Sequence, residues 1–172
     1  MRLMNLVLVL TFLSSCSSVT RIEATDLALE RIQTISNPVL PDFKNGHSSP
    51  MLVPMASSSV VSYEADLRQW SEVAIEMLHK EFVRQGAKPS ASAAAPIEIK
   101  VIRASSRTTG VGVVIDVGIQ ARRGTGAPIE VSGSTWHGNR LRACENAMNV
   151  AVELLLNNPR FRTLVSESGA AR

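Results

Sequence analysis

Apolar side chains occupy every second position from Val111 to Arg122, and this alternation constrains the fold more than any other feature of the chain. Because side chains of a β-strand point alternately to opposite faces, the pattern predicts a strand with one face on a core and one face open. The turn sequence RRGTGAP follows, and residues 129–135 continue as a returning antiparallel strand. The core-facing set is Val111, Val113, Ile115, Val117, Ile119 and Ala121, followed by Ile129, Val131, Gly133 and Thr135.

Two segments repeat apolar residues at three- and four-residue steps, which predicts amphipathic helices. The first helix is expected over Tyr63–Gln85, with Ser62 as its N-cap. The second is expected to begin at Asn139 or Arg140 and to end at Leu156, before the sequence NNP.

Two further strands are expected, at the edge from Ser57 to Tyr63 and over Ile97–Arg103. The order of strand, helix, three antiparallel strands and helix predicts an α+β fold, a two-layer sandwich in which an antiparallel sheet of about four strands carries two helices on one face. This single domain is expected to span residues 37–165, with a flexible tail over 166–172. The prolines between residues 37 and 54 leave room only for short extended pieces, near 38–40 and 51–55.

The first residues combine a positive start with an apolar run that is too short to span a membrane, as in a signal peptide. The run ends in Leu13-Ser14-Ser15-Cys16, which resembles the lipobox of bacterial lipoproteins. That resemblance implies acylation of Cys16 and cleavage just before it. We therefore expect a signal peptide over residues 1–15 and a lipidated N-terminus and tether over 16–36. An ordinary secretory peptide with an incidental cysteine is the alternative.

Two further residues, Ser17 and Cys144, bear on the expected lipidation of Cys16. Ser17 stands where an aspartate retains lipoproteins in the inner membrane, so resemblance to the sorting pattern implies the outer membrane, with the protein on the periplasmic face. Two or more acyl groups would hold the protein stably on the membrane. Cys144 then has no partner within the chain and lies on the apolar stripe of the second helix, so we expect a buried, inert thiol.

The charge balance does not predict nucleic-acid binding, because the net charge of +3 falls to +2 once Arg2 is removed (17 Lys and Arg against 15 Asp and Glu). From Arg103 onward, however, every basic residue except histidine is arginine. Guanidinium groups bind phosphate and carboxylate at two points, so such a face suits anionic lipid or an acidic partner, while solvated surface positions are the alternative. The candidate contacts are Arg107, Arg122, Arg123, Arg140 and Arg142.

Arrangements typical of catalysis or of metal and cofactor binding are not found in the sequence. The histidines His47, His79 and His137 lack metal-ligand spacing, and we expect no metal, no cofactor and no enzymatic activity. A hydrolase remains an alternative if His137, Asp116 and a serine such as Ser134 converge in the fold.

The two helical segments carry a resemblance to known proteins. ADLRQWSEVAIEMLHKEFVRQG (residues 65–86) and GNRLRACENAMNVAVELLLNNPRF (138–161) resemble segments of three groups of small Gram-negative envelope lipoproteins. These groups are the YajG-like lipoproteins, the auxiliary lipoproteins of ABC-type lipid transport systems and the lipoprotein partner of the lipopolysaccharide-assembly barrel. The resemblance is one of pattern and element order and covers about Ser57 to Val165.

The expected anchor, the absence of a catalytic arrangement and the arginine-rich second half together predict a function without catalysis. The chain is expected to be a membrane-anchored periplasmic accessory lipoprotein that binds a partner protein or lipid in envelope assembly or transport. A periplasmic module that binds a small ligand, in a pocket between the helix layer and the loop Asn37–Pro54, is the alternative, along with the hydrolase.

Overall fold

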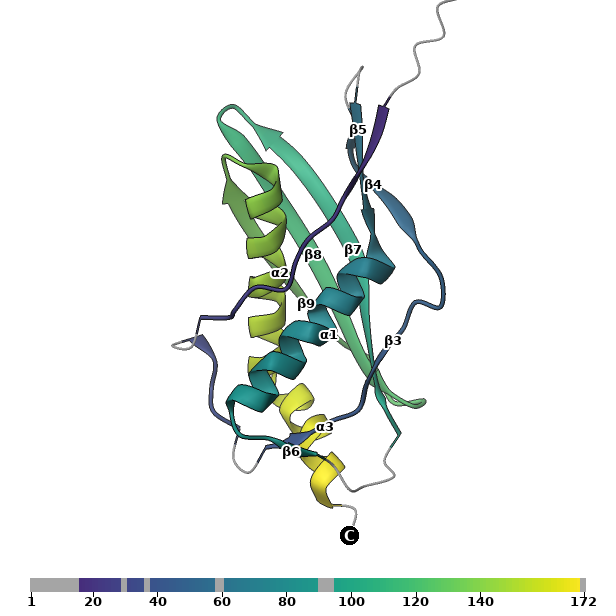
Figure 1. Ribbon diagram of the computed structural model, residues 1–172, viewed down its shortest axis with the longest axis vertical. Helices are drawn as coiled ribbons and strands as arrows, with labels where there is room; N and C mark the ends of the chain where they lie inside the picture. Colours follow the sequence, from purple (N-terminus) through teal and green to yellow (C-terminus); the bar gives the residue numbers. More distant parts are fainter. Residues whose placement is uncertain (1–15, 29–30, 36–37, 58–60, 90–94, 171–172) are drawn as a thin grey trace, which may run out of the picture.

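The computed structural model describes residues 16–28, 31–35, 38–57, 61–89 and 95–170, and the predicted signal peptide lies outside these residues (Figure 1). The helices and the sheets of two to four strands confirm the predicted α+β class. The helices are α1 Leu67–Arg84, α2 Arg140–Asn157 and α3 Pro159–Ala170.

The largest described sheet has four strands in the order β3-β7-β8-β9. Strands β7, β8 and β9 form the antiparallel meander that the alternating pattern predicts, although β7 runs well beyond residue 103. The prediction of a purely antiparallel sheet is wrong, because β3 joins the edge parallel to β7 and pairs Phe43 with Ile97. A strand this short fits between prolines at a sheet edge. The strands are β3 Phe43–Asn45, β7 Ile97–Thr109, β8 Gly112–Arg123 and β9 Ile129–His137.

The helices α1 and α2 lie side by side on one face of this sheet (Figure 1). Ile115, Val117 and Ile119 of β8 point to that face and are fully buried, as their alternation predicts. The opposite face of the sheet carries no helix among the described elements and presents polar positions such as Asp116 and Gln120. The core therefore lies in one layer between the helices and the sheet.

The first helix begins later than predicted. Its N-cap is Asp66 rather than Ser62, and the Asp66 carboxylate accepts a hydrogen bond from the backbone N–H of Arg68 at 3.0 Å. Residues 61–66 instead form strand β5, because their backbone groups pair with strands on both sides. The second helix begins at Arg140, with Asn139 as its cap, and confirms the prediction.

The last helix is longer than the single turn that the sequence suggests. The Asn158 side chain accepts hydrogen bonds from the backbone N–H groups of Arg160 and Phe161 and so starts α3. Phe161 and Val165 are buried against the core. Helix α3 continues to Ala170, so most of the predicted tail over 166–172 belongs to this helix as far as it is described.

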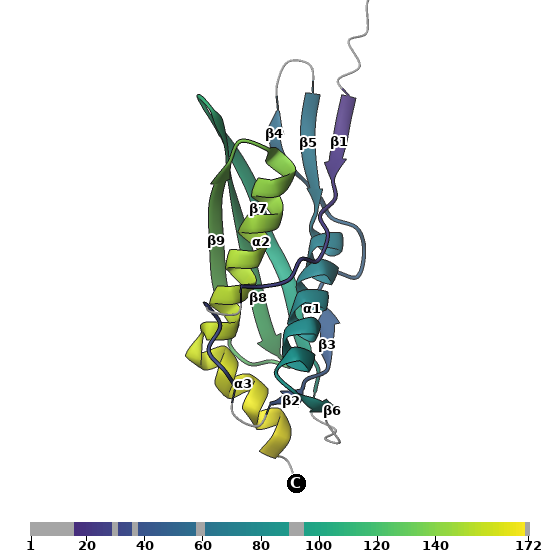
Figure 2. The ribbon, with the colours of Figure 1, turned by 60° about the vertical axis from the view of Figure 1, so that its left-hand side comes forward.

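A second sheet of three strands has the order β1-β5-β4 and projects from one end of the molecule (Figure 2). Strand β1 pairs parallel with β5, whereas β4 and β5 form an antiparallel hairpin. A small two-stranded sheet pairs β2 with β6. The bounds are β1 Cys16–Thr20, β4 Leu52–Ser57, β5 Val61–Asp66, β2 Val39–Leu40 and β6 Lys88–Pro89.

Residues 16–36 do not form the predicted tether as far as they are described. After β1, residues 21–28 and 31–35, which we call the strap, cross the outer side of α1 and α2 (Figure 1). Ile22, Ile32 and Ile35 of the strap are buried in the core. The indole Nε1 of the fully buried Trp70 donates to the Thr20 carbonyl at 3.0 Å. The folded unit therefore includes β1 and the strap, which precede the predicted start at residue 37.

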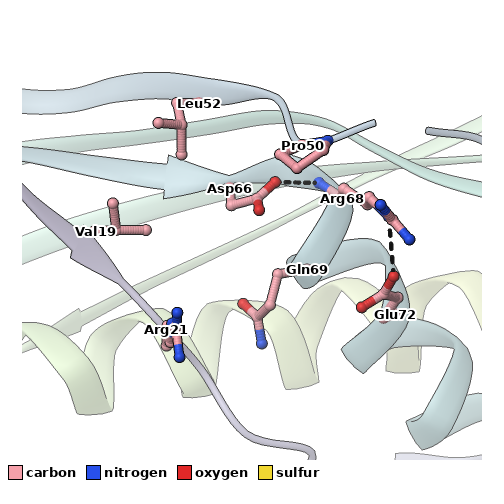
Figure 3. A pocket seen from close by; sticks show the side chains of 8 residues that line it. All are labelled: Val19, Arg21, Pro50, Leu52, Asp66, Arg68, Gln69 and Glu72. Atoms are coloured by element: carbon pink, nitrogen blue, oxygen red, sulfur yellow. Dashed lines mark hydrogen bonds and ion pairs between the residues drawn. The ribbon is translucent and has the colours of Figure 1, made fainter. Parts of the chain in front are cut away.

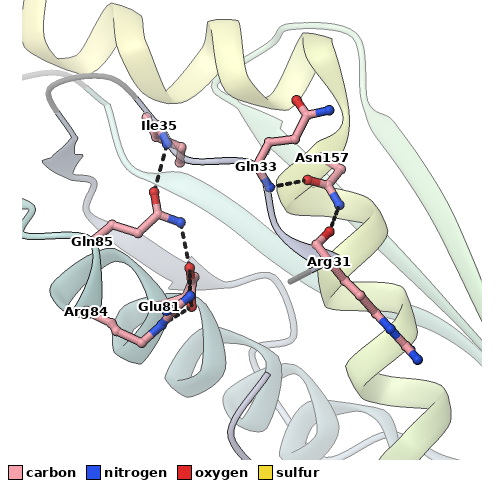
Figure 4. Close-up of polar contacts among 7 residues, drawn as sticks. All are labelled: Arg31, Gln33, Ile35, Glu81, Arg84, Gln85 and Asn157. Carbon is pink, nitrogen blue, oxygen red and sulfur yellow. Dashed lines mark hydrogen bonds and ion pairs between the residues drawn. The ribbon is translucent and has the colours of Figure 1, made fainter. Parts of the chain in front are cut away.

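Side chains of the helices hold the end of the strap (Figure 4). The Asn157 amide donates to the Arg31 carbonyl at 2.6 Å and accepts from the Gln33 N–H at 2.9 Å. The Gln85 side chain accepts from the Ile35 N–H at 2.8 Å and also donates to Glu81. These bonds satisfy backbone groups that would otherwise lie unpaired over the helices.

Candidate functional site

Cys16, the predicted acylation site, is the first residue of β1. Its backbone is the register partner of Val61, and Ser17 is the partner of Ser62. An acyl group on Cys16 would therefore be joined directly to a strand of the domain. The β1-β5-β4 sheet would then meet the membrane first.

A surface hollow of about 520 Å³ lies next to β1, between β1, β4 and the first turns of α1 (Figure 3). It combines apolar side chains from the two strands with charged and amide groups from the start of the helix. The lining residues are Val19, Arg21, Pro50, Leu52, Asp66, Arg68, Gln69 and Glu72.

Some of the polar groups that line this hollow already have hydrogen-bond or ion-pair partners within the protein. Arg68 forms an ion pair with Glu72, with Nε and Oε1 3.2 Å apart, and the Asp66 carboxylate caps α1 and also accepts from the Met51 N–H at 3.1 Å. Gln69 donates from Nε2 to the Ile22 carbonyl at 2.8 Å, but its Oε1 is buried and has no hydrogen-bond partner. Buried acceptors are normally satisfied, so this oxygen is available to a donor.

Arg21 completes the hollow from the strand side. It is exposed, and within the described ranges it has no hydrogen bond or ion pair. The hollow thus offers an available cation, an available acceptor and an apolar wall, which suits a small amphiphilic molecule with an anionic group. It lies partly against residues 50–52, the end of the loop where the ligand-binding alternative places a pocket, but the helix–sheet interface itself is filled by the core.

A second hollow of about 440 Å³ separates the strap from α1 and is lined by Thr25, Asp26, Leu27, Met77, Lys80, Glu81 and Arg84. Its charged groups are largely paired. Lys80 binds Glu76 with Nζ and Oε1 2.9 Å apart, and this hydrogen bond raises the pKa of Lys80. Arg84 binds the buried carboxylate of Glu81. This second hollow therefore has fewer free polar groups for a ligand than the first hollow.

The five predicted arginine contacts do not form one patch. Arg122 and Arg123 stand at the end of β8, where Arg122 binds Glu98 with Nη2 and Oε2 3.4 Å apart. Arg107 is exposed on β7 near the other end of the sheet, and Arg140 and Arg142 lie in the first turn of α2.

The Arg140 side chain contacts two neighbouring elements of the fold. Its guanidinium carbon lies 3.9 Å from the centroid of the Tyr63 ring, a cation–π contact, and its Nη1 donates to the Ser106 hydroxyl at 3.3 Å. Ser106 in turn donates to the Met55 carbonyl at 3.1 Å. Arg140 thus joins α2 and β7 to the β1-β5-β4 sheet. Arg142 is paired only with Glu145, and its side chain is 68% exposed.

The hydrolase alternative requires His137, Asp116 and Ser134 to meet. Asp116 and Ser134 are neighbours across β8 and β9, but His137 is an odd-numbered position of β9 and faces the other side of the strand. Its Nδ1 accepts a hydrogen bond from the Asn139 N–H at 2.9 Å. The three side chains therefore do not converge.

The other histidines have structural contacts. His47 is buried, with its Nε2 2.8 Å from the Val101 carbonyl, and the His79 ring lies edge-on to Phe43. Over the described residues no group of three or more His, Cys, Asp or Glu side chains could hold a metal ion.

The expectation that Cys144 is buried is confirmed. Its side chain is fully buried in the core face of α2, and burial raises the pKa of the thiol to about 12. A thiol with that pKa carries almost no thiolate at neutral pH, which agrees with the inert thiol that the sequence predicts.

The residues of the first hollow were not predicted, because they come from β1, the segment before β4 and the start of α1. The one local signal is Asp66, an N-cap residue type directly before the apolar stripe of α1. Comparison of the chain with known protein families, with curated proteins and with solved structures finds no match. None of the helices in the described part is long and apolar enough to cross a bilayer.

Proposed function

We propose that this chain is an accessory lipoprotein of a bacterial envelope, attached through acylated Cys16 to the periplasmic face of the outer membrane. It binds a partner protein or lipid during envelope assembly or transport and performs no catalysis. One observation carries the proposal: the cysteine that ends the lipobox-like Leu13-Ser14-Ser15-Cys16 belongs to β1, where it is the register partner of Val61.

The position of Cys16 within β1 limits where the chain can be cut. Cleavage before Cys16 keeps the five residues that pair with β5, whereas cleavage a few residues later would remove part of β1. Strand β1 pairs along five residues with β5, and the buried Trp70 is bonded to its last residue, Thr20. A processing site at Cys16 is therefore compatible with the fold that follows it.

The partner-binding part is supported by two surfaces. The hollow beside β1 offers Arg21 and the Gln69 acceptor next to an apolar wall, and the helix-free face of the four-stranded sheet presents polar side chains to solvent. An accessory protein needs such surfaces, whereas a hydrolase needs the convergence that His137, Asp116 and Ser134 lack.

Metabolic labelling with a palmitate analogue tests the anchor. The wild-type chain is expected to incorporate label and to fractionate with membranes, and Cys16→Ser is expected to lose both. Cys144→Ser is the matched control, since it also removes one thiol and should keep the label. A mature N-terminus at any residue other than 16 would contradict the proposal.

Affinity purification from membranes after mild cross-linking tests the partner. The acylated protein is expected to retain one reproducible envelope protein or lipid, and substitution of Arg21 by alanine should weaken retention if the hollow contributes. Arg160→Ala, an exposed arginine on α3, serves as control. Failure to retain any partner or lipid would leave an anchored protein without the accessory role.

A small-ligand-binding module is the second candidate, favoured by the volume of the hollow and by the unpaired Gln69 Oε1. Native mass spectrometry of the purified protein should then show a bound small molecule that Gln69→Leu no longer holds. A ligand-free spectrum under gentle ionisation would remove this candidate.

A further inference from the structure

Three large apolar side chains are exposed around one end of the molecule. Val111, in the turn between β7 and β8, is 82% exposed, Trp136 near the end of β9 is 54% exposed, and Leu141 in the first turn of α2 is 45% exposed. Exposed apolar side chains that gather at one end of a molecule are typical of contact sites for proteins or membranes.

This end is also the end at which β1 begins. The turn between β7 and β8, the start of α2 and the start of β1 lie at the same end in both ribbon views (Figures 1 and 2). The contacts agree with the views. Arg140 of α2 lies on the ring of Tyr63, and Tyr63 is the register partner of Ser18, two residues after Cys16.

Trp136 is held in its exposed position by the sheet. Its Nε1 donates to the Thr109 hydroxyl at 3.1 Å, and its ring covers Gly112, where an added Cβ would lie 2.8 Å from that nitrogen. Gly112 therefore makes room for the indole on the helix-free face. A ring fixed with one polar edge and one apolar face suits the boundary between lipid and water.

Basic side chains accompany the apolar ones. Arg107, Val114 and Trp136 are register partners in one row across β7, β8 and β9, and Arg107 is exposed. Arg142 follows Leu141 directly and is largely exposed. Guanidinium groups bind phosphate oxygens at two points, so this arrangement complements a phosphate-bearing lipid surface.

We propose that Arg107, Val111, Trp136, Leu141 and Arg142 form a membrane-contact surface that lies in the headgroup region of the phospholipid bilayer holding the anchor. This inference rests on the proposed acylation of Cys16. Because β1 begins at Cys16, no linker separates the acyl chains from the fold, and the end of the domain that carries these five residues is held against the bilayer. The anchor then sets the orientation of the domain as well as its location.

Tryptophan fluorescence tests the surface directly. The chain has two tryptophans, of which Trp70 is fully buried and Trp136 is exposed. Acylated protein purified from membranes is placed in liposomes of phosphatidylethanolamine and phosphatidylglycerol, with or without bromine on the acyl chains near the headgroups. Brominated lipid is expected to lower the emission, and Trp136→Phe should abolish the difference.

Leu141 and Leu154 supply a matched pair of variants. Both are 45% exposed on α2, but Leu154 lies near the opposite end of the helix. Leu141→Gln is expected to reduce quenching of Trp136, whereas Leu154→Gln should leave it at the wild-type level.

The outcomes separate the two proposals. Mass spectrometry that finds no acyl group on Cys16 overturns the anchor and this surface together. Acylated protein whose Trp136 emission is the same in both liposomes overturns the surface alone. Emission that changes only when an envelope protein is added would assign these residues to a protein partner, and that also overturns the membrane contact.

Discussion

Gly133 determines how closely α2 approaches the sheet. A Cβ at this position of β9 would lie 2.4 Å from the Ala147 carbonyl oxygen and from the Ala151 nitrogen, which are backbone atoms of α2. Buried alanines on the facing side of the helix make the same close approach possible. Neither partner can rotate away, because both atoms belong to the helix backbone.

Replacing Gly133 by alanine should therefore destabilise the protein. Overpacking of this kind costs about 1–3 kcal/mol, which urea denaturation can resolve. Gly110→Ala is the control, because an added Cβ there has no atom within 4 Å. Equal midpoints for the two variants would show that α2 is less tightly packed on β9 than the structure indicates.

Cys144 gives the stability a pH dependence. Burial raises the pKa of its thiol to about 12, whereas a thiol in an unfolded chain has a pKa of about 8.5. Between these two pKa values the unfolded state loses a proton that the native state keeps. The contribution of the Cys144 thiol to the free energy of unfolding is therefore complete below about pH 8.5 and is lost as the pH rises towards about 12. The loss should be about 2 kcal/mol between pH 8 and pH 10.

The Cys144→Ala variant isolates this contribution from other groups that titrate in the same range. Its unfolding free energy should fall less steeply than that of the wild type between those two pH values, as measured by urea denaturation at each. Parallel pH profiles would mean that the thiol is not buried as described.

At the scale of elements, side chains of all three helices hold the strap, through bonds such as those of Gln69, Asn149 and Arg162. Asn157 alone binds the backbone on both sides of Ile32, through the Arg31 carbonyl and the Gln33 N–H. Asn157→Ala should release this stretch locally while the sheet and helices persist, because these two hydrogen bonds lie at the surface. Limited digestion with trypsin should then cut after Arg31 faster than in the wild type.

Asn146→Ala tests whether the effect is specific, since Asn146 is an exposed asparagine of the same helix that makes no described hydrogen bond. It should leave the rate of cleavage after Arg31 unchanged. If both variants are cut at the wild-type rate, the buried isoleucines hold the strap without Asn157.

The two ends of α1 show how far local pattern extends. The apolar stripe from Leu67 to Phe82 predicts the body of the helix correctly. The predicted start at Tyr63 is too early, because the composition of residues 63–66 is also acceptable in a helix. These residues belong to β5 instead, since they pair with β4 and β1. The carboxylate of Asp66 then marks the actual boundary.

At the scale of the whole molecule, the N-terminal residues are part of the folding unit. A chain that begins at residue 37 would lack β1 and the strap and would expose surface that Ile22, Ile32 and Ile35 cover. Burying an isoleucine contributes about 1.5–3 kcal/mol, so the three together approach the total stability of a typical domain.

The truncated chain should therefore be largely unfolded at 25 °C, as judged by near-ultraviolet circular dichroism and by hydrogen exchange. A chain that begins at Cys16 is the control and should retain the wild-type midpoint, since every described element is present. If the chain that begins at residue 37 is stable, residues 16–36 are not needed for folding and the predicted tether is supported.

Elements whose apolar side chains repeat at a local period could be predicted from the order of residues alone. The period-two run of β8, its return in β9, the body of α1, the whole of α2 and the burial of Cys144 all follow from neighbours a few residues apart. Periodicity carries this information because one face of each element must leave water.

Contacts between distant segments could not be predicted in this way. The parallel edge strand β3, the pairing of β1 with β5, the strap across the helices and the hollow beside Arg21 join segments far apart in the chain. Ile32 and Ile35 are a helical step apart, but residues 33–35 form no helix, so the burial of these residues and of Ile22 could not be read from spacing. Such contacts depend on surfaces that exist only after the helices and the sheet have packed together.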